Sequence, residues 1–154
     1  MPVETLKNFL DSNSIKYVRI IHSPAYTSQE IAASAHIPGK ELAKTVIVKL
    51  DGDMAMAVLP APAQVDLDAL AKAAGASNAD LATEDEFRDA FQKCEVGAMP
   101  PFGNLYGLPV YVDDSLLSDT EIAFNAGTHA ELLRMPLEDY RRLVNPKVAT
   151  FAAQ

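Results

Sequence analysis

A lysine inside an apolar strand is the first residue of this sequence with clear potential for chemistry. Residues 42–50 read Leu-Ala-Lys-Thr-Val-Ile-Val-Lys-Leu and are rich in β-branched side chains, which predicts a β-strand. Side chains alternate between the two faces of a strand, so Lys44 shares its face with Leu42, Val46 and Val48. Either its ammonium group reaches solvent at the strand end, or it projects into a pocket as a fixed positive charge.

A segment rich in glycine and proline is the second candidate. Residues 96–103 read Val-Gly-Ala-Met-Pro-Pro-Phe-Gly, and two glycines around two prolines exclude regular structure. Glycine allows a ligand to approach the backbone closely, and proline stiffens the loop so that its amide groups keep their direction. The segment is either a binding loop or a rigid crossover between a helix and a strand.

The other reactive residues favour neither a protein nucleophile nor a metal site. Cys94 is the single cysteine and ends an expected amphipathic helix, where a packed small hydrophobe is more common than a nucleophile. His22, His36 and His129 lack the spacing of metal ligands, and the chain has no Gly-x-Ser-x-Gly or phosphate-binding glycine motif. We therefore expect no metal and no cofactor, and a reaction that depends mainly on positioning and charge stabilisation.

These candidates need a sheet and helices to hold them. Asp51-Gly52 between two apolar runs predicts a β-hairpin of residues 42–50 and 53–60, with its first strand central in a sheet. Further strands are expected at residues 15–21, 108–112, 121–125, 131–135 and 148–151. Helices are expected at residues 3–14, 27–35, 66–74, 83–93 and 137–143, the last with Pro136 at its first position. We predict a single α/β (α+β) domain over residues 1–154, with a mixed, mainly antiparallel β-sheet flanked by helices.

Composition limits the classes of function. The chain of 154 residues is 49% hydrophobic, and none of its apolar runs approaches the roughly 20 residues of a membrane span. With no secretory signal and one cysteine, it is expected in the reducing cytoplasm and without a membrane partner. Its net charge of −8, from 21 acidic and 13 basic residues, argues against binding to duplex DNA.

Several short motifs together resemble one known family. The chain is similar to the YbaK family, the aminoacyl-tRNA editing domains related to the editing insertion of bacterial prolyl-tRNA synthetase. The matching motifs, in order over nearly the whole chain, are His22 followed by Thr27-Ser28-Gln29-Glu30, Ala43-Lys44-Thr45, Val65-Asp66-Leu67, Gly97-Ala98-Met99-Pro100-Pro101, Val112-Asp113 and Asn125-Ala126-Gly127.

The resemblance implies trans-editing. This reaction hydrolyses the ester that joins a wrong small amino acid (alanine, serine, threonine or cysteine) to the 3′-terminal adenosine of a tRNA. Such an ester is already activated, so a water or the neighbouring ribose hydroxyl can assist without a protein nucleophile. The implied partner is the acceptor end of mischarged tRNA, with an aminoacyl-tRNA synthetase or an elongation factor as a source of further affinity. The alternative is a non-catalytic module of the same fold that recognises an amino-acid-like ligand or a synthetase.

The resemblance assigns catalysis to Lys44 and Gly97. Lys44 would hold the terminal phosphate or stabilise negative charge that develops at the ester, and Gly97 and Ala98 would present backbone groups to the carbonyl or the amino-acid part. The implied substrate-binding residues are Thr45, Ala98, Met99, Pro101, Gly127 and His129.

Three of these residues are assigned to the wall of an amino-acid pocket. Thr45 and Met99 would form part of the wall, and His129 either orders a water there or is an exposed histidine of a hairpin. The pocket would select by size, because extra bulk in a close-fitting site costs more than its contacts return.

Overall fold

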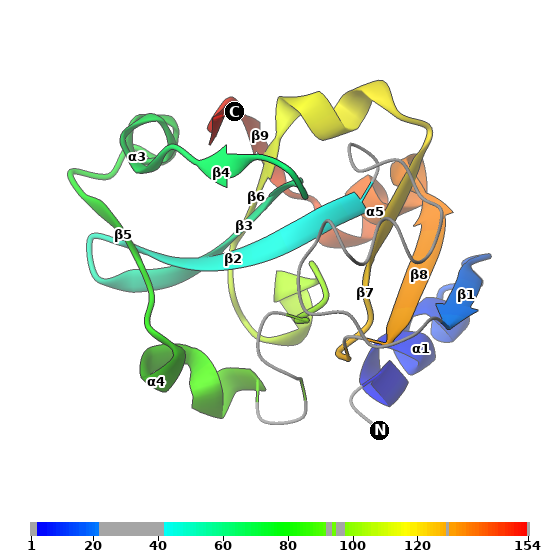
Figure 1. The fold of residues 1–154 in the computed structure, drawn as a ribbon. Helices are drawn as coiled ribbons and strands as arrows, with labels where there is room; N and C mark the ends of the chain where they lie inside the picture. The colour runs from blue at the N-terminus through cyan, green and yellow to red at the C-terminus, as the bar shows by residue number, and fades with distance from the viewer. Residues whose placement is uncertain (1–2, 22–41, 92–93, 95–97, 129, 154) are drawn as a thin grey trace.

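The computed structural model describes residues 3–21, 42–91, 94, 98–128 and 130–153. The main sheet consists of β1 (Val18–Ile21), β2 (Leu42–Leu50), β3 (Asp53–Pro60), β5 (Ala79–Leu81), β6 (Val110–Asp113), β7 (Glu121–Asn125), β8 (Glu131–Pro136) and β9 (Lys147–Ala149). Its order is β1-β8-β7-β2-β3-β6-β9, with β5 also paired to β2 (Figure 1). A second small sheet pairs β4 (Gln64–Val65) with β10 (Ala152–Ala153).

The described helices lie around the main sheet (Figure 1). They are α1 (Val3–Ser12), α3 (Leu67–Ala74), α4 (Glu84–Phe87) and α5 (Leu137–Val144), with short 3-10 helices at Arg88–Phe91, Gly103–Leu105 and Asp114–Ser118. Within the described ranges, no helix is long and apolar enough to cross a membrane.

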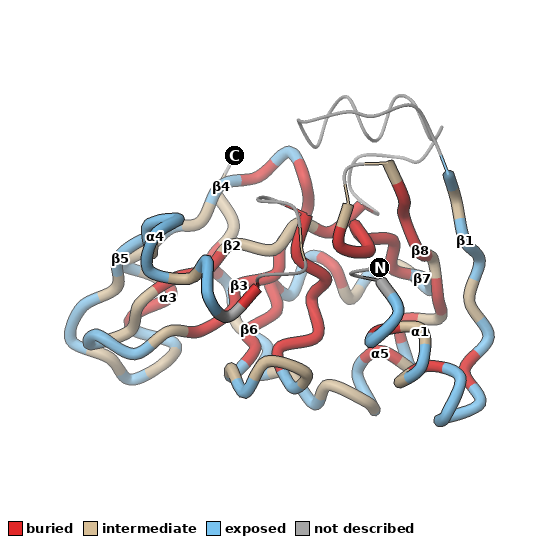
Figure 2. Tube along the Cα trace, turned by 90° about the horizontal axis from the view of Figure 1, so that it is seen from below, coloured by how far each residue is buried: buried red, intermediate tan, exposed pale blue. Residues whose placement is uncertain are grey.

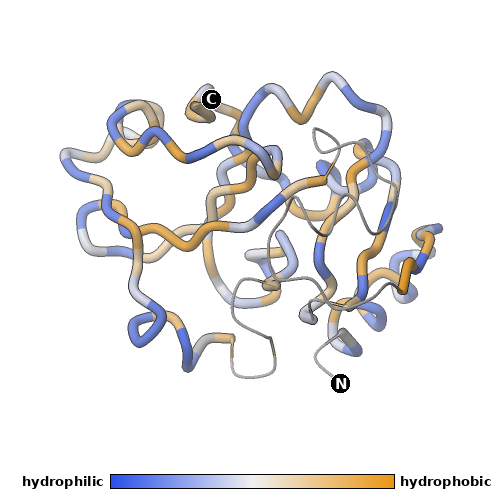
Figure 3. Tube along the Cα trace, in the orientation of Figure 1, coloured by the Kyte–Doolittle hydropathy of each residue, from blue (hydrophilic) through white to orange (hydrophobic). Residues whose placement is uncertain are grey.

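The predicted hairpin is confirmed and lies in the middle of the sheet. Leu50 and Asp53 face each other across the turn, where Asp51 and Gly52 adopt φ angles of +51° and +91°. Two successive positive φ angles define the turn type that best continues the twist of a hairpin, and the Asp-Gly pair supplies them. β2 has neighbouring strands on both edges. Much of the hairpin is hydrophobic, as expected for strands in the interior of a sheet (Figure 3).

The predicted fold class is also confirmed. β2 pairs with β7, β3 with β6, and β6 with β9 in parallel, whereas β2–β3, β2–β5, β7–β8 and β1–β8 are antiparallel. The sheet is therefore mixed and mainly antiparallel, as expected for an α/β domain of this kind.

The side-chain alternation of β2 divides the core into two layers. Ala43 and Ile47 face the larger layer, which α1 and α5 cover with residues such as Leu6 and Tyr140. Val48 faces the other layer, which contains Leu70 from α3. The central strands are buried between these layers, whereas β1 at the edge is mostly exposed (Figure 2).

Several element boundaries differ from expectation by one to several residues, and three of them have a clear local cause. The strand expected from residue 15 begins at Val18, because Ile15 donates its N–H to Leu10 and closes the turn after α1. Pro136 ends β8 and caps α5 instead of starting the helix. The helix expected over residues 83–93 has its capping box at Thr83, but α4 ends at Phe87 and tightens into a 3-10 helix. It buries no residue, so packing does not support a longer helix. The helix expected at residues 27–35 lies outside the described residues.

Candidate functional site

One edge of β2 is divided between two neighbouring strands. Leu42 and Ala43 pair with β7 in parallel, and residues 48–50 pair with β5 in the antiparallel direction. Residues 44–46 belong to neither ladder, and we call this stretch the β2 opening. Backbone groups that neither ladder uses must find other partners, so the opening is a candidate position for a ligand.

A cavity of about 210 Å³ lies against the β2 opening, and we call it the edge cavity. Its described lining residues are Thr45, Val46, Ile47, Leu81, Ala82, Phe87 and Met99. Thr45 and Val46 project to opposite faces of the sheet, so a cavity that touches both lies beside the strand edge. A larger cavity of about 450 Å³ near the start of α5 is lined by residues such as Asp119 and Arg141 and by none of the predicted site residues that the structure describes.

Lys44 lies half-buried in the β2 opening, on the other face of β2 from Thr45. Its partner across the hairpin is Leu59, which is fully buried. Burial lowers the pKa of the Lys44 ammonium group, and no described carboxylate forms an ion pair with it. A partly desolvated cation without a described counter-ion is suited to bind an anionic group of a ligand.

The loop that follows residue 97 is held at two carbonyl groups. The carbonyl of Ala98 accepts a hydrogen bond from the N–H of Gly127 at 2.9 Å, and Gly127 adopts a φ of +98°, which favours glycine. The carbonyl of Pro101 accepts one from the hydroxyl of Tyr140 at 2.6 Å. Burial raises the pKa of this Tyr140 hydroxyl, so it remains a donor at neutral pH.

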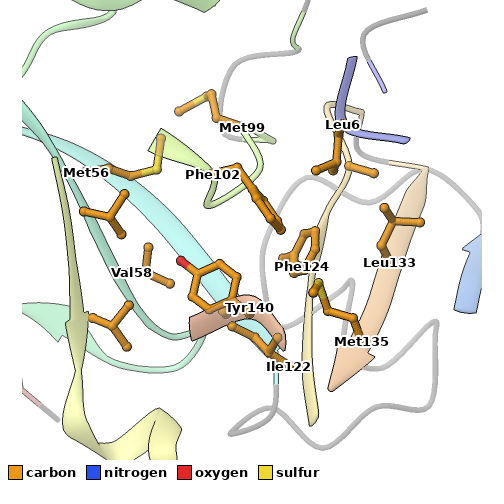
Figure 4. Packing of buried hydrophobic residues seen from close by; sticks show 14 of the residues in the cluster. Leu6, Met56, Val58, Met99, Phe102, Ile122, Phe124, Leu133, Met135 and Tyr140 are labelled. Carbon is orange, nitrogen blue, oxygen red and sulfur yellow. The ribbon is translucent and has the colours of Figure 1, made fainter. Parts of the chain in front are cut away.

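Aromatic packing fixes the other end of the loop. The ring of Phe102 contacts those of Phe124 and Tyr140 edge to face, each with a centroid distance of 5.3 Å (Figure 4). All three side chains are fully buried. Residues 98–102 therefore form a rigid segment whose backbone groups keep their direction.

The sequence model of the aminoacyl-tRNA editing domain matches residues 22–143 of this chain. The chain belongs to the aminoacyl-tRNA editing domain family. It is 34% identical over 114 residues to a protein from Escherichia coli K12 that is named multifunctional Ser/Thr-tRNA deacylase ProXp-y. The alignment covers 71% of this chain and 68% of that protein. Membership confirms the predicted resemblance and the predicted activity, trans-editing by hydrolysis of mischarged aminoacyl-tRNA.

Solved structures show the same fold. A proposed trans-editing enzyme for prolyl-tRNA synthetase superimposes with a TM-score of 0.83 at 22% identity, over 99% of this chain and 98% of that chain. The hypothetical protein APE2540 gives a TM-score of 0.87 at 22% identity, over 97% of this chain and 99% of that chain.

The structure of the editing domain brings several predicted site residues together. Thr45 and Met99 line the edge cavity, and Ala98 is joined to Gly127 by a hydrogen bond. Pro101 is buried in the same loop and held by α5. The side chain of Lys44 is separated from that of Thr45 by the sheet itself. Gly97 and His129, also predicted for the site, lie outside the described residues.

Cys94 packs against the larger core layer without the features of a nucleophile. Its Sγ lies 3.4 Å from the hydroxyl of Tyr106, and burial raises the pKa of the thiol. A thiol is reactive as its thiolate, which burial disfavours. In the described ranges, no group of three or more His, Cys, Asp and Glu side chains could hold a metal ion.

Sequence reasoning missed four residues of the editing domain that matter for the site. Leu81 and Phe87 line the edge cavity, and Tyr140 holds the loop. Asn125 lies 8% exposed at the end of β7, and its Oδ1 accepts no hydrogen bond from any described residue. Asn125 was visible as part of a family motif, whereas the other three are ordinary apolar or aromatic residues that only the fold brings to the site.

Proposed function

We propose that this editing domain removes serine or threonine from mischarged tRNA, with Lys44 as the cation that binds the substrate. The relative named as a Ser/Thr-tRNA deacylase supports the choice of amino acid. The observation that carries the role of Lys44 is its half-buried ammonium group, which has no described counter-ion and belongs to the first residue of the β2 opening.

Hydrolysis at this site depends on positioning. The aminoacyl ester is already activated, so a water assisted by the neighbouring ribose hydroxyl attacks the carbonyl without a protein nucleophile. Lys44 holds the terminal phosphate or stabilises the negative charge that develops at the ester, and backbone groups of Gly97 and Ala98 face the reacting carbonyl. The hydrogen bonds from Gly127 and Tyr140 keep this loop in place, which lowers the cost of reorganisation in the transition state.

Selection among amino acids works by size. Ala98 and Met99 are buried in the fixed loop that forms the wall of the proposed site, so a side chain that is too large would have to displace them at a cost in free energy. We assign to His129 the role of ordering a water molecule in this site. The side chains of serine and threonine are small enough for such a site and leave space for the water.

The wider context is part of the same proposal. A net charge of −8 provides little attraction for the phosphate backbone of tRNA. The domain therefore binds only the acceptor end, and a synthetase or an elongation factor supplies the remaining affinity. The protein acts in the cytoplasm, where aminoacyl-tRNA is made and consumed, and residues 1–154 form one editing domain.

A panel of mischarged tRNAs tests this function. Seryl, threonyl, alanyl and cysteinyl esters are each incubated with the native protein and with Lys44→Ala and Lys72→Ala. Lys72 is exposed on α3, so its variant has the same change in charge away from the site. We expect hydrolysis of the seryl and threonyl esters, and a loss of about 10- to 100-fold in kcat/KM for Lys44→Ala alone, because it removes a charge-assisted contact.

Two results would contradict the proposal. If none of the esters is hydrolysed by the native protein, the non-catalytic module is the better explanation. If Lys44→Ala and Lys72→Ala are equally active, with folding verified by circular dichroism, Lys44 is not the substrate-binding cation.

A further inference from the structure

The backbone of Thr45 presents hydrogen-bonding groups to the edge cavity that no described backbone group uses. Leu50 and Asp53 close the two-residue turn of the hairpin and are therefore a hydrogen-bonded pair. Such pairs alternate along an antiparallel ladder, so the backbone groups of Thr45 and Ile47 point away from β3. The hydrogen bond of Ile47 confirms this direction, because its carbonyl accepts a hydrogen bond from the N–H of Ala82 in the segment after β5, at 3.0 Å. The N–H and C=O of Thr45 face the β2 opening, and no described backbone group pairs with them.

The walls of the edge cavity are apolar and include an aromatic ring. Leu81 is 56% exposed, which is unusual for a large aliphatic side chain, and stands at the cavity with the half-buried Phe87. Apart from Thr45, the described lining residues have no polar side-chain group except the thioether of Met99. They suit a flat apolar ring, and the volume of about 210 Å³ lies below the roughly 300 Å³ at which pockets for drug-sized ligands begin.

We propose that the edge cavity binds the adenine base at the 3′ end of the tRNA, and that the Thr45 backbone recognises it. This inference rests on the proposed function, because it assigns another part of the same substrate. The N6 amino group of adenine donates to the Thr45 carbonyl, and the adjacent ring nitrogen accepts from the Thr45 N–H. Phe87 and Leu81 cover the faces of the ring, as aromatic and apolar side chains do for bases of single strands.

The neighbouring residues agree with this placement. Lys44 precedes Thr45 in β2, so a cation for the terminal phosphate lies one residue from the groups that read the base. Met99 joins the edge cavity to the rigid loop, so the ester of the same nucleotide lies toward Ala98. One strand and one loop thus contact three parts of the terminal adenosine.

Binding of free nucleotides tests the inference without catalysis. AMP and IMP are titrated into the isotopically labelled protein, and backbone amide shifts are followed by NMR. IMP has the same size but an oxygen in place of the amino group, which turns a donor toward the Thr45 carbonyl into an acceptor. We expect AMP to shift the amide of Thr45 and IMP to bind about tenfold more weakly or worse.

Matched variants locate the site. Leu81→Trp fills the edge cavity and should weaken AMP binding, whereas Val148→Trp should not, because Val148 is similarly exposed on the far edge strand β9. Equal affinity for AMP and IMP, or equal effects of the two variants, would overturn the inference.

A second measurement separates the inference from the proposed function. Seryl-tRNA ending in inosine is compared with seryl-tRNA ending in adenosine, and the inference predicts a higher KM for the inosine form with a smaller change in kcat. Equal hydrolysis of both would refute adenine recognition and leave the deacylase intact. AMP recognition at Thr45 without hydrolysis of any ester would refute the deacylase and support the adenine site.

Discussion

Replacing Tyr140 by phenylalanine removes one oxygen atom and the hydrogen bond that holds the carbonyl of Pro101. The bond is 2.6 Å long, Tyr140 is fully buried, and Pro101 is buried as well, so water cannot replace the lost donor without rearrangement. A buried acceptor left without a partner costs about 1–3 kcal/mol. For a chain of this size, a loss of about 2 kcal/mol lowers Tm by about 4–8 °C.

The same substitution should reduce editing beyond its effect on stability. The Pro101 carbonyl anchors the loop that carries the proposed catalytic backbone groups, and small misplacement of such groups can cost up to about 100-fold in rate. We expect kcat/KM for the edited ester to fall about tenfold or more at 25 °C, where the variant remains folded. Urea unfolding and single-turnover deacylation measure the two effects separately.

Tyr111→Phe provides the matched control. Tyr111 is 6% exposed and also loses one hydroxyl group, but no described residue accepts a hydrogen bond from it. If the two variants unfold with free energies within about 0.5 kcal/mol of each other, the energetic argument for Tyr140 is wrong. If Tyr140→Phe is less stable yet fully active, the loop does not depend on this anchor for catalysis.

Two further predictions concern stability. Burial alone would raise the pKa of Asp113, but the hydroxyl of Ser115 and three backbone N–H groups hold it below its usual value. A lowered carboxyl pKa contributes stability that is present above about pH 4 and is lost as the pH falls through the folded pKa. Asp113→Asn should therefore be less stable than the native protein at pH 7, and the difference should become smaller in acid. Urea unfolding at both pH values measures this difference. Gly103→Ala should cost about 1–3 kcal/mol, because a Cβ there would lie 2.5 Å from Val110 Cγ2 and 2.6 Å from the carbonyl oxygen of Leu108; an unchanged Tm would contradict this.

Local signals made the elements around the site predictable. The Asp-Gly turn fixed the hairpin and its register, and Asp66 and Gly75 delimit α3 as capping residues. Lys44 was recognisable because a charge on an apolar strand conflicts with its surroundings. These features depend on residues within a few positions of each other, which is the range over which sequence patterns carry physical information.

Features that depend on distant contacts were not predictable. The β2 opening exists because β7 and β5, from separate parts of the chain, pair with different ends of one strand. Tyr140 reads as one more apolar position of an amphipathic helix, and its hydroxyl finds Pro101 through the fold, 39 residues away. Leu81 and Phe87 likewise gain a role only when β5 and α4 come to lie beside β2.

The short length of the β2 opening affects how the protein avoids misassembly. An unpaired strand edge normally invites strands of other molecules, and proteins protect such edges to prevent aggregation. Here β7 and β5 flank residues 44–46 on both sides, so an extended strand from another chain cannot lie along them. The proposed adenine ring is short enough to need only these residues. A short interruption between two flanking strands can therefore leave hydrogen-bonding backbone groups for a small ligand and still prevent amyloid-like pairing.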